Sequence, residues 1–295
     1  MVNDIYVLGG GITGLAAGYI LDLPVITKEV GGQLSSNFSL GPRFIHSKKE
    51  TREFVKRLGL PITERQVKIG YFYDNDYHDS IPPSLVNEYN LKTRGTIDVT
   101  SSIGKSSFTA LKVSFSDVIE KLRQRVKIIQ DKILRITADE MFGLKGKYKY
   151  RKIISTIPLP ELYSLCRIYR TFNYRPIGYN FVTFDEALIR ESTFNYDYVY
   201  YPELKYPQYR ITKVSRGFVY EYCYSPFIKY PIRTIWHDMG KILPTLRAVS
   251  PSKKIILLGR FAEWNDNIMF HHILQKLSAL DLSKEDVQVI RGVQL

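Results

Sequence analysis

The chain begins with a glycine pattern, Gly9-x-Gly11-x-x-Gly14, that restricts the possible folds more than any other feature of the sequence. The apolar residues Ile5 to Leu8 before it predict a strand, and the small and apolar residues Ile12 to Leu21 after it predict a helix. In such a unit the first glycine permits a tight turn, the second lets backbone approach a pyrophosphate, and the third lets the helix pack on the strand. Because the helix amides and dipole then face the phosphates, the sequence predicts a dinucleotide site at the head of the chain.

The same unit continues into a second strand that begins at Pro24-Val25-Ile26. An acidic residue at the end of that strand would bind the ribose hydroxyls, and Glu29 is the only candidate, slightly late because the loop is short. Ile12 and Thr13 complete the phosphate loop between the second and third glycines. This part of the sequence leaves open whether the dinucleotide is NAD or FAD.

Apolar periodicity predicts further helices and strands along the chain. The predicted helices are Thr51 to Leu58, Phe115 to Arg123 and Ile268 to Leu280. The predicted strands are Val126 to Ile129, Ile133 to Ile136, Tyr150 to Ile157 and Ile255 to Leu258. No internal repeat and no low-complexity segment interrupts this alternation.

The stretch from Phe194 to Tyr230 differs in character, because it holds ten of the 22 tyrosines. They alternate along the chain, and a period of two places each group of three on one face of a strand. The two groups are Tyr196, Tyr198 and Tyr200, and Tyr220, Tyr222 and Tyr224. We therefore expect an antiparallel sheet here, separate from the nucleotide-binding part.

The overall composition is that of a globular protein, with 44% hydrophobic and 24% charged residues. No apolar stretch is long enough to span a bilayer, and the N-terminus resembles no signal peptide, so a cytoplasmic location is expected. Cys166 and Cys223 are far apart and form no zinc pattern with the histidines. Adjacent His271 and His272 diverge by about 100° on a helix, which disfavours a shared metal.

The net charge of +13 is the unusual global value. A basic surface attracts anions such as nucleic acid, acidic lipid, nucleotide-sugars or FAD. The basic residues are spread out, as in Lys48-Lys49 and Lys253-Lys254, and form no long block. This distribution favours a small, anionic ligand over dedicated nucleic-acid binding, and it leaves the oligomeric state open.

A second glycine pair follows the first unit, in Val30-Gly31-Gly32-Gln33-Leu34-Ser35-Ser36. It resembles the GG motif of the FAD superfamily that includes amine oxidases, protoporphyrinogen oxidases and UDP-galactopyranose mutases. The next segment, Leu40-Gly41-Pro42-Arg43-Phe44-Ile45-His46-Ser47, is similar to a segment of the mutases that lies beside the flavin ring. His46 matches the second histidine of that segment, and Arg43 replaces the first. Alternatively, His46 is an ordinary polar residue before a helix.

Two later segments resemble the same superfamily. Ile133 takes the place of the aliphatic residue whose backbone meets the adenine, and Ile153 to Pro158, which includes Thr156, is similar to the strand that returns to the nucleotide domain. Leu258-Gly259-Arg260-Phe261-Ala262-Glu263-Trp264-Asn265-Asp266-Asn267 looks like the C-terminal flavin-binding segment. Asn265, Asp266 and Asn267 are favourable N-cap residues for the predicted helix. Its N-terminus would stabilise the negative charge of a reduced flavin.

The resemblance implies an α/β fold: a Rossmann-like FAD-binding domain of the GR2 type with an inserted antiparallel-sheet substrate domain. The expected FAD domain is discontinuous, covering 1–70, 100–160 and 250–295, and the substrate domain covers 71–99 and 161–249. FAD is expected to be noncovalent, with its ring in the cleft between the domains near His46 and Asn267. His46 and Arg43 are the candidate catalytic residues. The candidate FAD-binding residues are Gly9, Gly11, Ile12, Thr13, Gly14, Glu29, Gly32, Gln33, Leu34, Gly41, Pro42, Arg43, Ile133, Thr156, Gly259, Arg260, Trp264, Asn267 and Ile268.

Three functions are compatible with these residues. The favoured one is an oxidoreductase of the amine-oxidase and protoporphyrinogen-oxidase type, in which hydride passes from a small molecule to flavin N5. The second is a nucleotide-sugar mutase, in which Arg167, Arg170 and Arg175 would bind a diphosphate. The third is a flavoprotein that acts on a nucleic-acid-linked or other macromolecular substrate, or a binding subunit that keeps flavin for structure.

Overall fold

The computed structural model describes residues 4–34, 44–97, 103–187, 194–243 and 248–282, and the side chains of Asp238 and Met239 are left out. The chain divides into two compact units. The first unit comprises Met1–Thr63, Leu111–Phe172 and Pro244–Leu295, and the second comprises Glu64–Ala110 and Asn173–Leu243. Each unit is therefore assembled from segments that are distant in sequence.

A parallel sheet forms the centre of the first unit, with strand order β17-β11-β1-β2-β7. All four neighbouring pairs are parallel. The strands are β1 (Ile5–Leu8), β2 (Val25–Thr27), β7 (Ile128–Gln130), β11 (Lys152–Ser155) and β17 (Ile255–Leu257). The strand and helix predicted around the first glycine pattern are confirmed, because β1 and α1 (Ile12–Leu21) have the expected bounds.

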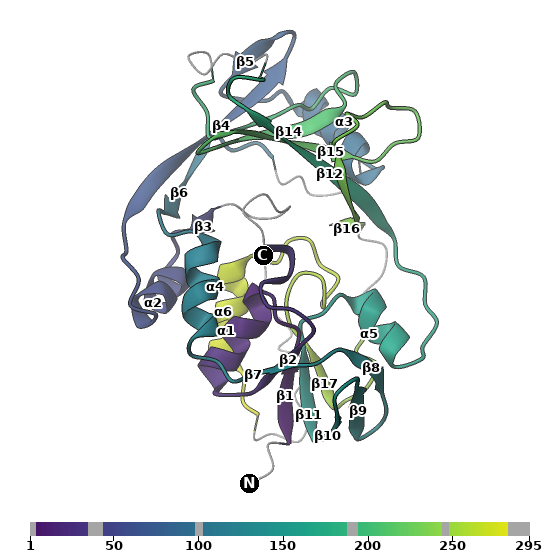
Figure 1. Ribbon diagram of the computed structural model, residues 1–295. Helices are drawn as coiled ribbons and strands as arrows, with labels where there is room; N and C mark the ends of the chain where they lie inside the picture. The colour runs from purple at the N-terminus through teal and green to yellow at the C-terminus, as the bar shows by residue number, and fades with distance from the viewer. Residues whose placement is uncertain (1–3, 35–43, 98–102, 188–193, 244–247, 283–295) are drawn as a thin grey trace. The chain divides into compact units, whose positions relative to one another are not determined.

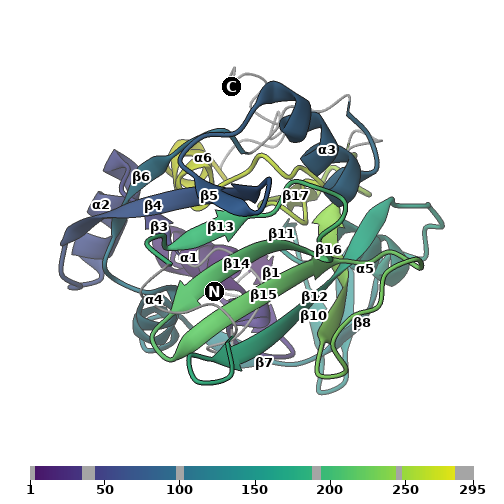
Figure 2. The same cartoon turned by 90° about the horizontal axis from the view of Figure 1, so that it is seen from above.

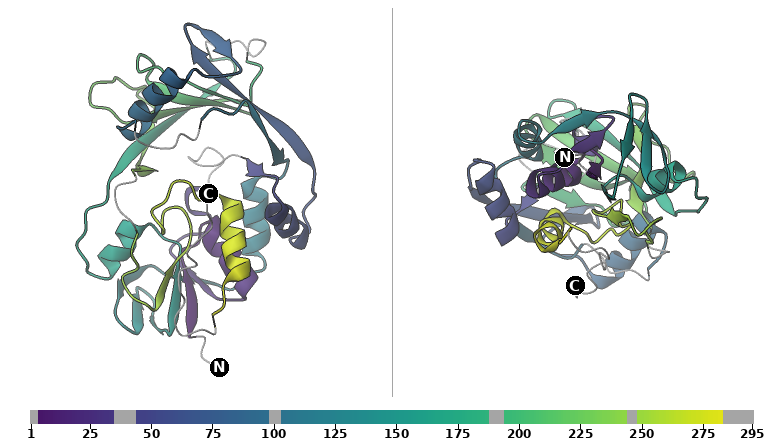
Figure 3. Two further views of the ribbon diagram at one scale, coloured as in Figure 1. Left: turned by 180° about the vertical axis from the view of Figure 1, so that it is seen from behind. Right: turned by 90° about the horizontal axis from the view of Figure 1, so that it is seen from below.

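Side-chain alternation along these strands separates two layers. Val7, Val25 and Ile154 are completely buried in one core with residues of α1, α4 (Phe115–Arg123) and α6 (Phe270–Ala279). Tyr6 points to the other face, where its ring lies 6.0 Å from that of Tyr148. Figure 1 shows the three helices side by side, and the view from behind in Figure 3 agrees.

Smaller elements complete the first unit. Tyr148 belongs to a three-stranded antiparallel sheet. Helix α2 packs on α6 through the rings of Phe54 and Phe270, whose centroids are 5.6 Å apart. These elements are the 3-10 helix η1 (Gly32–Leu34), β3 (Ile45–His46), α2 (Lys49–Arg57), β8 (Ile133–Ile136), β9 (Glu140–Gly143), β10 (Lys147–Lys149) and α5 (Leu159–Leu165).

A larger mixed sheet forms the second unit, with neighbours in the order β16-β12-β15-β14-β13-β4-β6 and with β5 paired to β4. The pairs β12–β16, β12–β15, β14–β15, β13–β14 and β4–β5 are antiparallel, whereas β13 and β4 are parallel. Figure 2 shows β12, β15 and β14 crossing this unit side by side. The elements are β4 (Glu64–Tyr73), β5 (Asp76–His78), α3 (Pro83–Arg94), β6 (Ser107–Leu111), β12 (Tyr174–Thr183), β13 (Tyr198–Tyr200), β14 (Gln208–Val214), β15 (Gly217–Cys223) and β16 (Ile235–Ile242).

The arrangement predicted for the tyrosines is partly wrong. Tyr198 and Tyr200 share a face of β13, but Tyr196 lies before the strand and packs with the cluster that contains Tyr201, on the opposite face. The register pairs Val199 with Ile211 and Ile211 with Tyr220, so the tyrosine group on β15 also lies opposite to Tyr198. Sequence alternation determines which residues of one strand share a face, whereas the register between strands decides which faces coincide.

The predicted start of the C-terminal helix is also wrong. α6 begins at Phe270, and its N-cap is Met269, whose amide donates to the side chain of His272 and not to any of the three predicted residues. Asn265, Asp266 and Asn267 precede the helix, and the Asn265 Oδ1 accepts a hydrogen bond of 3.0 Å from the Asn267 amide. The asparagine side chain therefore stabilises a turn in the segment that leads to the helix.

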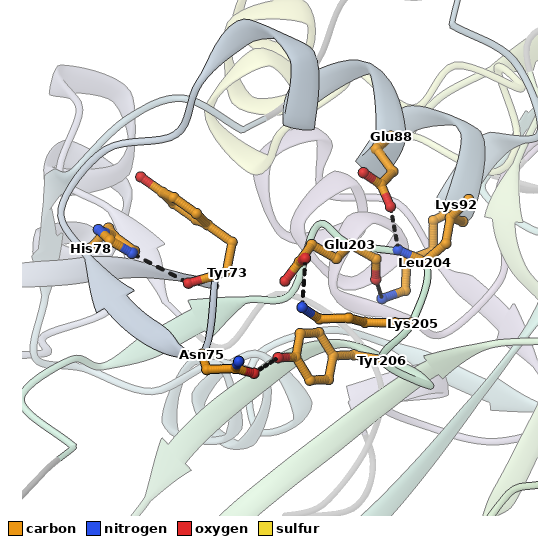
Figure 4. A network of polar contacts seen from close by, with 9 residues as sticks. All are labelled: Tyr73, Asn75, His78, Glu88, Lys92, Glu203, Leu204, Lys205 and Tyr206. Carbon is orange, nitrogen blue, oxygen red and sulfur yellow. Dashed lines mark hydrogen bonds and ion pairs between the residues drawn. The ribbon is translucent and has the colours of Figure 1, made fainter.

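Helix α3 is fixed to the β13–β14 connection by one buried lysine. Lys92 is 7% exposed, and its ammonium group donates to the carbonyl oxygens of Tyr201, Glu203 and Gln208, each at 2.8 Å. Glu88 on the same helix accepts a hydrogen bond of 2.6 Å from the Leu204 amide. Figure 4 shows Lys92, Glu88, Glu203 and Leu204 of this network, beside the ion pair between Lys205 and Glu203.

Candidate functional site

The glycine turn after β1 is built by close backbone contacts. The Gly9 amide donates to the carbonyl oxygen of Ile26 at 2.9 Å, which joins the turn to β2. A Cβ atom at Gly14 would lie 1.8 Å from the carbonyl oxygen of Gly9, so any side chain at Gly14 would force α1 away from the strand. The third glycine of the pattern is therefore required for packing, as its place in the motif predicts.

Gly11 differs from its neighbours in the space beside it. Among the residues that the structure describes, no heavy atom lies within 4 Å of the position that its Cβ would occupy. Gly11 is the N-cap of α1, no side chain makes a cap hydrogen bond there, and the first turn, Ile12 to Leu15, contains no acidic residue. Because the first amides of a helix have no partner within the helix, this end of α1 is suited to an anion.

The second glycine segment lies directly against the first. The Gly31 amide donates to the carbonyl oxygen of Gly10 at 2.8 Å, and Gly11 and Gly31 form a parallel bridge. A Cβ at Gly32 would lie 3.3 Å from the Gly11 Cα. The start of η1, which also contains Gln33 and Leu34, therefore lies beside Gly11. Sequence reasoning missed Gly10 and Gly31, although a run of adjacent glycines in both motifs was the available signal.

Glu29 follows β2 by two residues, and its side chain is exposed. Its carbonyl oxygen accepts a hydrogen bond of 2.6 Å from the Thr27 hydroxyl. A Cβ at Gly10 would lie 2.5 Å from that same oxygen, so the Glu29 backbone adjoins the glycine turn. Glu29 therefore lies beside the glycine turn, and its contact with a ribose stays a prediction.

Thr156 and Ile133 occupy the ends of neighbouring segments. The Thr156 amide donates to the carbonyl oxygen of Leu8 at 2.8 Å, and its hydroxyl to the same oxygen at 3.1 Å. Ile133 begins β8 and is 7% exposed. The Asp131 amide, two residues earlier, donates to the Thr27 carbonyl at 2.9 Å and so fixes this connection to the end of β2.

The C-terminal segment returns to the head of α1 at Gly259. A Cβ there would lie 3.0 Å from the Thr13 Cγ2. The Gly259 amide donates to the Glu263 carboxylate at 3.0 Å, and the Glu263 amide donates to the Gly259 carbonyl at 2.8 Å. Glu263 also forms an ion pair with Lys276 on α6. The loop that follows β17 therefore contacts α1 through Gly259 and α6 through Glu263.

The remaining residues expected to bind the cofactor in this segment have mainly internal contacts. Arg260 accepts a backbone hydrogen bond of 3.0 Å from the Asn265 amide. Trp264 is 4% exposed, and its ring lies 5.1 Å from that of Phe172. Ile268 is buried in the core shared with α1, α4 and α6. These contacts position the loop between Gly259 and α6.

His46 lies beside another histidine that is distant in sequence. The His46 and His271 ring centroids are 6.3 Å apart, and those of His271 and His272 are 4.0 Å apart. Burial, followed by the nearby His272, His46 and Lys48, lowers the pKa of His271 to about 4. The His272 Nδ1 accepts a hydrogen bond of 3.2 Å from the Met269 amide. No sequence signal could have placed His46 beside His271, because only the packing of α6 does so.

Other residues named in the sequence analysis either lie outside the described ranges or belong to different units. Gly41, Pro42 and Arg43 lie outside the described residues. The three arginines considered for a diphosphate belong to different units: Arg167 and Arg170 to the first, and Arg175 to the second. The Arg170 guanidinium donates to the Tyr163 hydroxyl at 3.2 Å. Across the ranges that the structure describes, no group of three or more His, Cys, Asp or Glu residues is arranged to hold a metal ion.

Arg175 has a cationic neighbour that the sequence did not reveal. The register of β12 and β16 places Arg175 directly opposite Lys241, and the Lys241 ammonium lies 5.1 Å from the centre of the Tyr209 ring. Like charges that face each other across strands destabilise a sheet. The Arg175 guanidinium also donates to the carbonyl oxygen of Lys92 near the end of α3, so both cations already have partners within the second unit.

Both cysteines are free: Cys223 is buried and Cys166 is partly exposed. Among the described residues, no helix has the length and apolar character needed to cross a membrane.

Solved structures share the fold, although no family model matches the sequence and no curated protein matches it. A reduced UDP-galactopyranose mutase has a TM-score of 0.67 at 14% identity, over 95% of this chain and 93% of that chain. An oxidoreductase from Methanosarcina mazei has a TM-score of 0.65 at 10% identity, over 93% of this chain and 99% of that chain. A putative protoporphyrinogen oxidase from Exiguobacterium sp. 255-15 has a TM-score of 0.62 at 11% identity, over 93% and 97%.

These similarities confirm the resemblance seen in the sequence, because the mutase and the protoporphyrinogen oxidase are two of the classes that it indicated. At such low identities the similarity shows the fold alone. The parallel sheet with helices is consistent with a Rossmann-like nucleotide-binding fold.

Proposed function

We propose that this chain binds FAD noncovalently and is a flavin-dependent oxidoreductase that acts on a small, anionic molecule. One observation carries the proposal: no described atom lies within 4 Å of a Cβ at Gly11, the N-cap of α1, and Gly259 lies against Thr13 in the first turn of the same helix. A helix end without a side-chain cap, beside a glycine that leaves space for a ligand, is suited to a pyrophosphate. The fold shared with the mutase and the oxidoreductases supports the choice of a flavin dinucleotide.

The proposed site takes its residues from both ends of the chain. Gly9, Gly11, Ile12, Thr13 and Gly14 would hold the pyrophosphate, and Glu29 the ribose hydroxyls. Gly32, Gln33, Leu34, Ile133 and Thr156 would surround the nucleotide, whereas Gly259, Arg260, Trp264, Asn267 and Ile268 would support the flavin end. Hydride acceptance is the chemistry that a bound flavin supplies, and the protein binds, orients and desolvates the reactants.

We assign His46 to the reacting end of this site. Its neighbour His271 stays neutral at physiological pH because its pKa is about 4. A neutral imidazole at this position can accept or donate a hydrogen bond without adding positive charge. Arg43, three residues before His46, would contribute to the same end.

We assign the second unit to substrate binding and the first to FAD. Tyr198, Tyr200 and Tyr71 lie on one face of the large sheet, with the rings of Tyr71 and Tyr200 stacked at 5.9 Å. Arg210, which pairs with Tyr200 in the register, forms an ion pair with the buried Glu221. The net charge of +13 favours an anionic substrate.

Two measurements test the proposal. Titration of the purified protein with FAD should quench flavin fluorescence with saturation, whereas riboflavin, which lacks the pyrophosphate, should bind far more weakly. Anaerobic addition of amines or alcohols that also carry an anionic group should then bleach the absorbance of the flavin in the FAD complex. Absence of FAD binding would overturn the whole proposal, and binding without bleaching by any such compound would remove the oxidoreductase assignment.

A second candidate is a flavin-dependent nucleotide-sugar mutase. The fold shared with a UDP-galactopyranose mutase favours it, at a TM-score of 0.67. A UDP-sugar should then perturb the spectrum of the reduced flavin without oxidising it. An unchanged spectrum would exclude the mutase.

A further inference from the structure

The connection between β15 and β16 exposes large apolar side chains. Phe227 is 95% exposed and Ile232 is 104% exposed. Each belongs to a tight turn: the Ile228 amide donates to the Ser225 carbonyl at 3.3 Å, and the Thr234 amide donates to the Pro231 carbonyl at 3.0 Å. The connection therefore displays one apolar side chain on each of two turns.

A cluster of aromatic side chains fixes the base of this connection. The Tyr230 ring lies 4.8 Å from that of Trp236 and 5.7 Å from that of Tyr222. The Tyr230 hydroxyl donates to the Cys223 carbonyl at 2.8 Å and accepts a hydrogen bond of 2.6 Å from the Ser225 amide. Since these contacts hold both ends of the connection, Phe227 and Ile232 are displayed by an ordered scaffold.

The charged residues of the connection itself are all basic. Lys229 and Arg233 are exposed, and residues 222–236 contain no Asp or Glu. The carboxylate of Glu186 is 4.0 Å from the Arg233 guanidinium, and both side chains are largely exposed. Such a surface pair is weak, so Arg233 can still attract an anionic surface.

Single exposed apolar residues are ordinary on a protein surface. Here exposed apolar side chains and basic side chains occur together on one short connection. Phe227 and Ile232 offer apolar groups for acyl chains, and Lys229 and Arg233 offer charges for anionic headgroups. Tyr224 and Trp236 are 48% and 36% exposed. Their amphipathic rings favour the boundary between acyl chains and headgroups. Two separate turns with apolar tips fit a deformable lipid surface better than a flat protein interface.

We propose that the connection Tyr224–Trp236 docks this protein reversibly on an anionic lipid surface. Phe227 and Ile232 enter the acyl boundary, while Lys229 and Arg233 contact phosphate-bearing headgroups. The net charge of +13 attracts the protein to the surface over a longer range. Docking is independent of FAD, so its test is separate from that of the proposed function.

Co-sedimentation with phosphatidylcholine vesicles, with and without phosphatidylglycerol, tests the docking. The wild-type chain should partition onto the anionic vesicles, and Phe227→Ser/Ile232→Ser should reduce partitioning at least tenfold. Lys229→Gln and Arg233→Gln should each reduce it roughly fivefold, and added salt should do the same. Leu144→Ser is the matched control, because Leu144 is 68% exposed in the other unit and should have no effect.

Fluorescence gives a second readout, because the chain has two tryptophans. Trp264 is 4% exposed, so a blue shift on adding vesicles reports Trp236. Equal partitioning of the wild type and the Phe227→Ser/Ile232→Ser variant would overturn the proposal. So would wild-type self-association that the same variant abolishes, because a second copy of the chain would then cover the connection.

Discussion

Gly259 lies against Thr13, with 3.0 Å between the position of a Gly259 Cβ and the Thr13 Cγ2. Thr13 lies near the start of the sequence and Gly259 near its end, yet the two residues lie against each other at the first turn of α1. Gly259 has a φ of 104°, a conformation that residues with a side chain rarely adopt. Two segments from opposite ends of the sequence therefore meet at the first turn of α1.

The first prediction separates ligand binding from packing in the glycine pattern. Gly11→Ala should leave stability nearly unchanged, because φ is −71° and the Cβ would face open space, but it should weaken FAD binding at least tenfold. Gly14→Ala should destabilise the fold by about 3 kcal/mol, because its Cβ would collide with the Gly9 carbonyl. Urea unfolding and FAD titration check both. Unchanged FAD affinity in Gly11→Ala would place the pyrophosphate elsewhere.

The second prediction concerns Gly259. Gly259→Ala should lower stability by about 2 kcal/mol and also weaken FAD binding, because both φ and the Thr13 contact oppose a side chain. Gly104→Ala is the matched control: Gly104 has a φ of 122° but no atom within 4 Å of a Cβ. It should lower stability through backbone strain alone and leave FAD binding intact. Equal loss of FAD affinity in both variants would refute a specific role for Gly259.

The third prediction concerns Lys92 and the three carbonyl oxygens that it binds. Lys92→Met keeps the aliphatic stem but leaves the carbonyls of Tyr201, Glu203 and Gln208 without this donor. The free energy of unfolding should fall by about 3 kcal/mol. Lys205→Met, which removes one ion pair with the partly buried Glu203, should lower the urea midpoint less than Lys92→Met does. A midpoint for Lys92→Met equal to that of the wild type would show that the network contributes little.

The fourth prediction is a pH dependence that arises from His271. Burial and the neighbouring His272, His46 and Lys48 lower its folded pKa to about 4, against an ordinary value of 6.5, while Glu50 opposes the shift. As the pH falls from about 6.5 to about 4, the unfolded chain binds a proton that the folded chain does not, so stability decreases. His271→Gln should remove part of this decrease, measured as urea midpoints at several pH values. An identical pH profile in wild type and variant would contradict the assignment.

Local sequence determined the elements of the nucleotide-binding framework. The strand Ile5–Leu8, the helix Ile12–Leu21 and the helix Phe115–Arg123 follow from apolar periodicity and glycine placement, and the structure has the same bounds. These signals act over a few residues, so a reader of the sequence can find them. The resemblance of the glycine segments to FAD proteins was likewise carried by short motifs.

Tertiary structure alone decided the contacts between distant segments. The register of β13, β14 and β15 placed Tyr198 and Tyr220 on opposite faces, although both groups of tyrosines alternate in the same way. The packing of α6 brought His271 to His46, and the pairing of β12 with β16 brought Lys241 to Arg175. Periodicity specifies one strand or helix at a time, whereas these neighbours depend on how separate elements pair and pack.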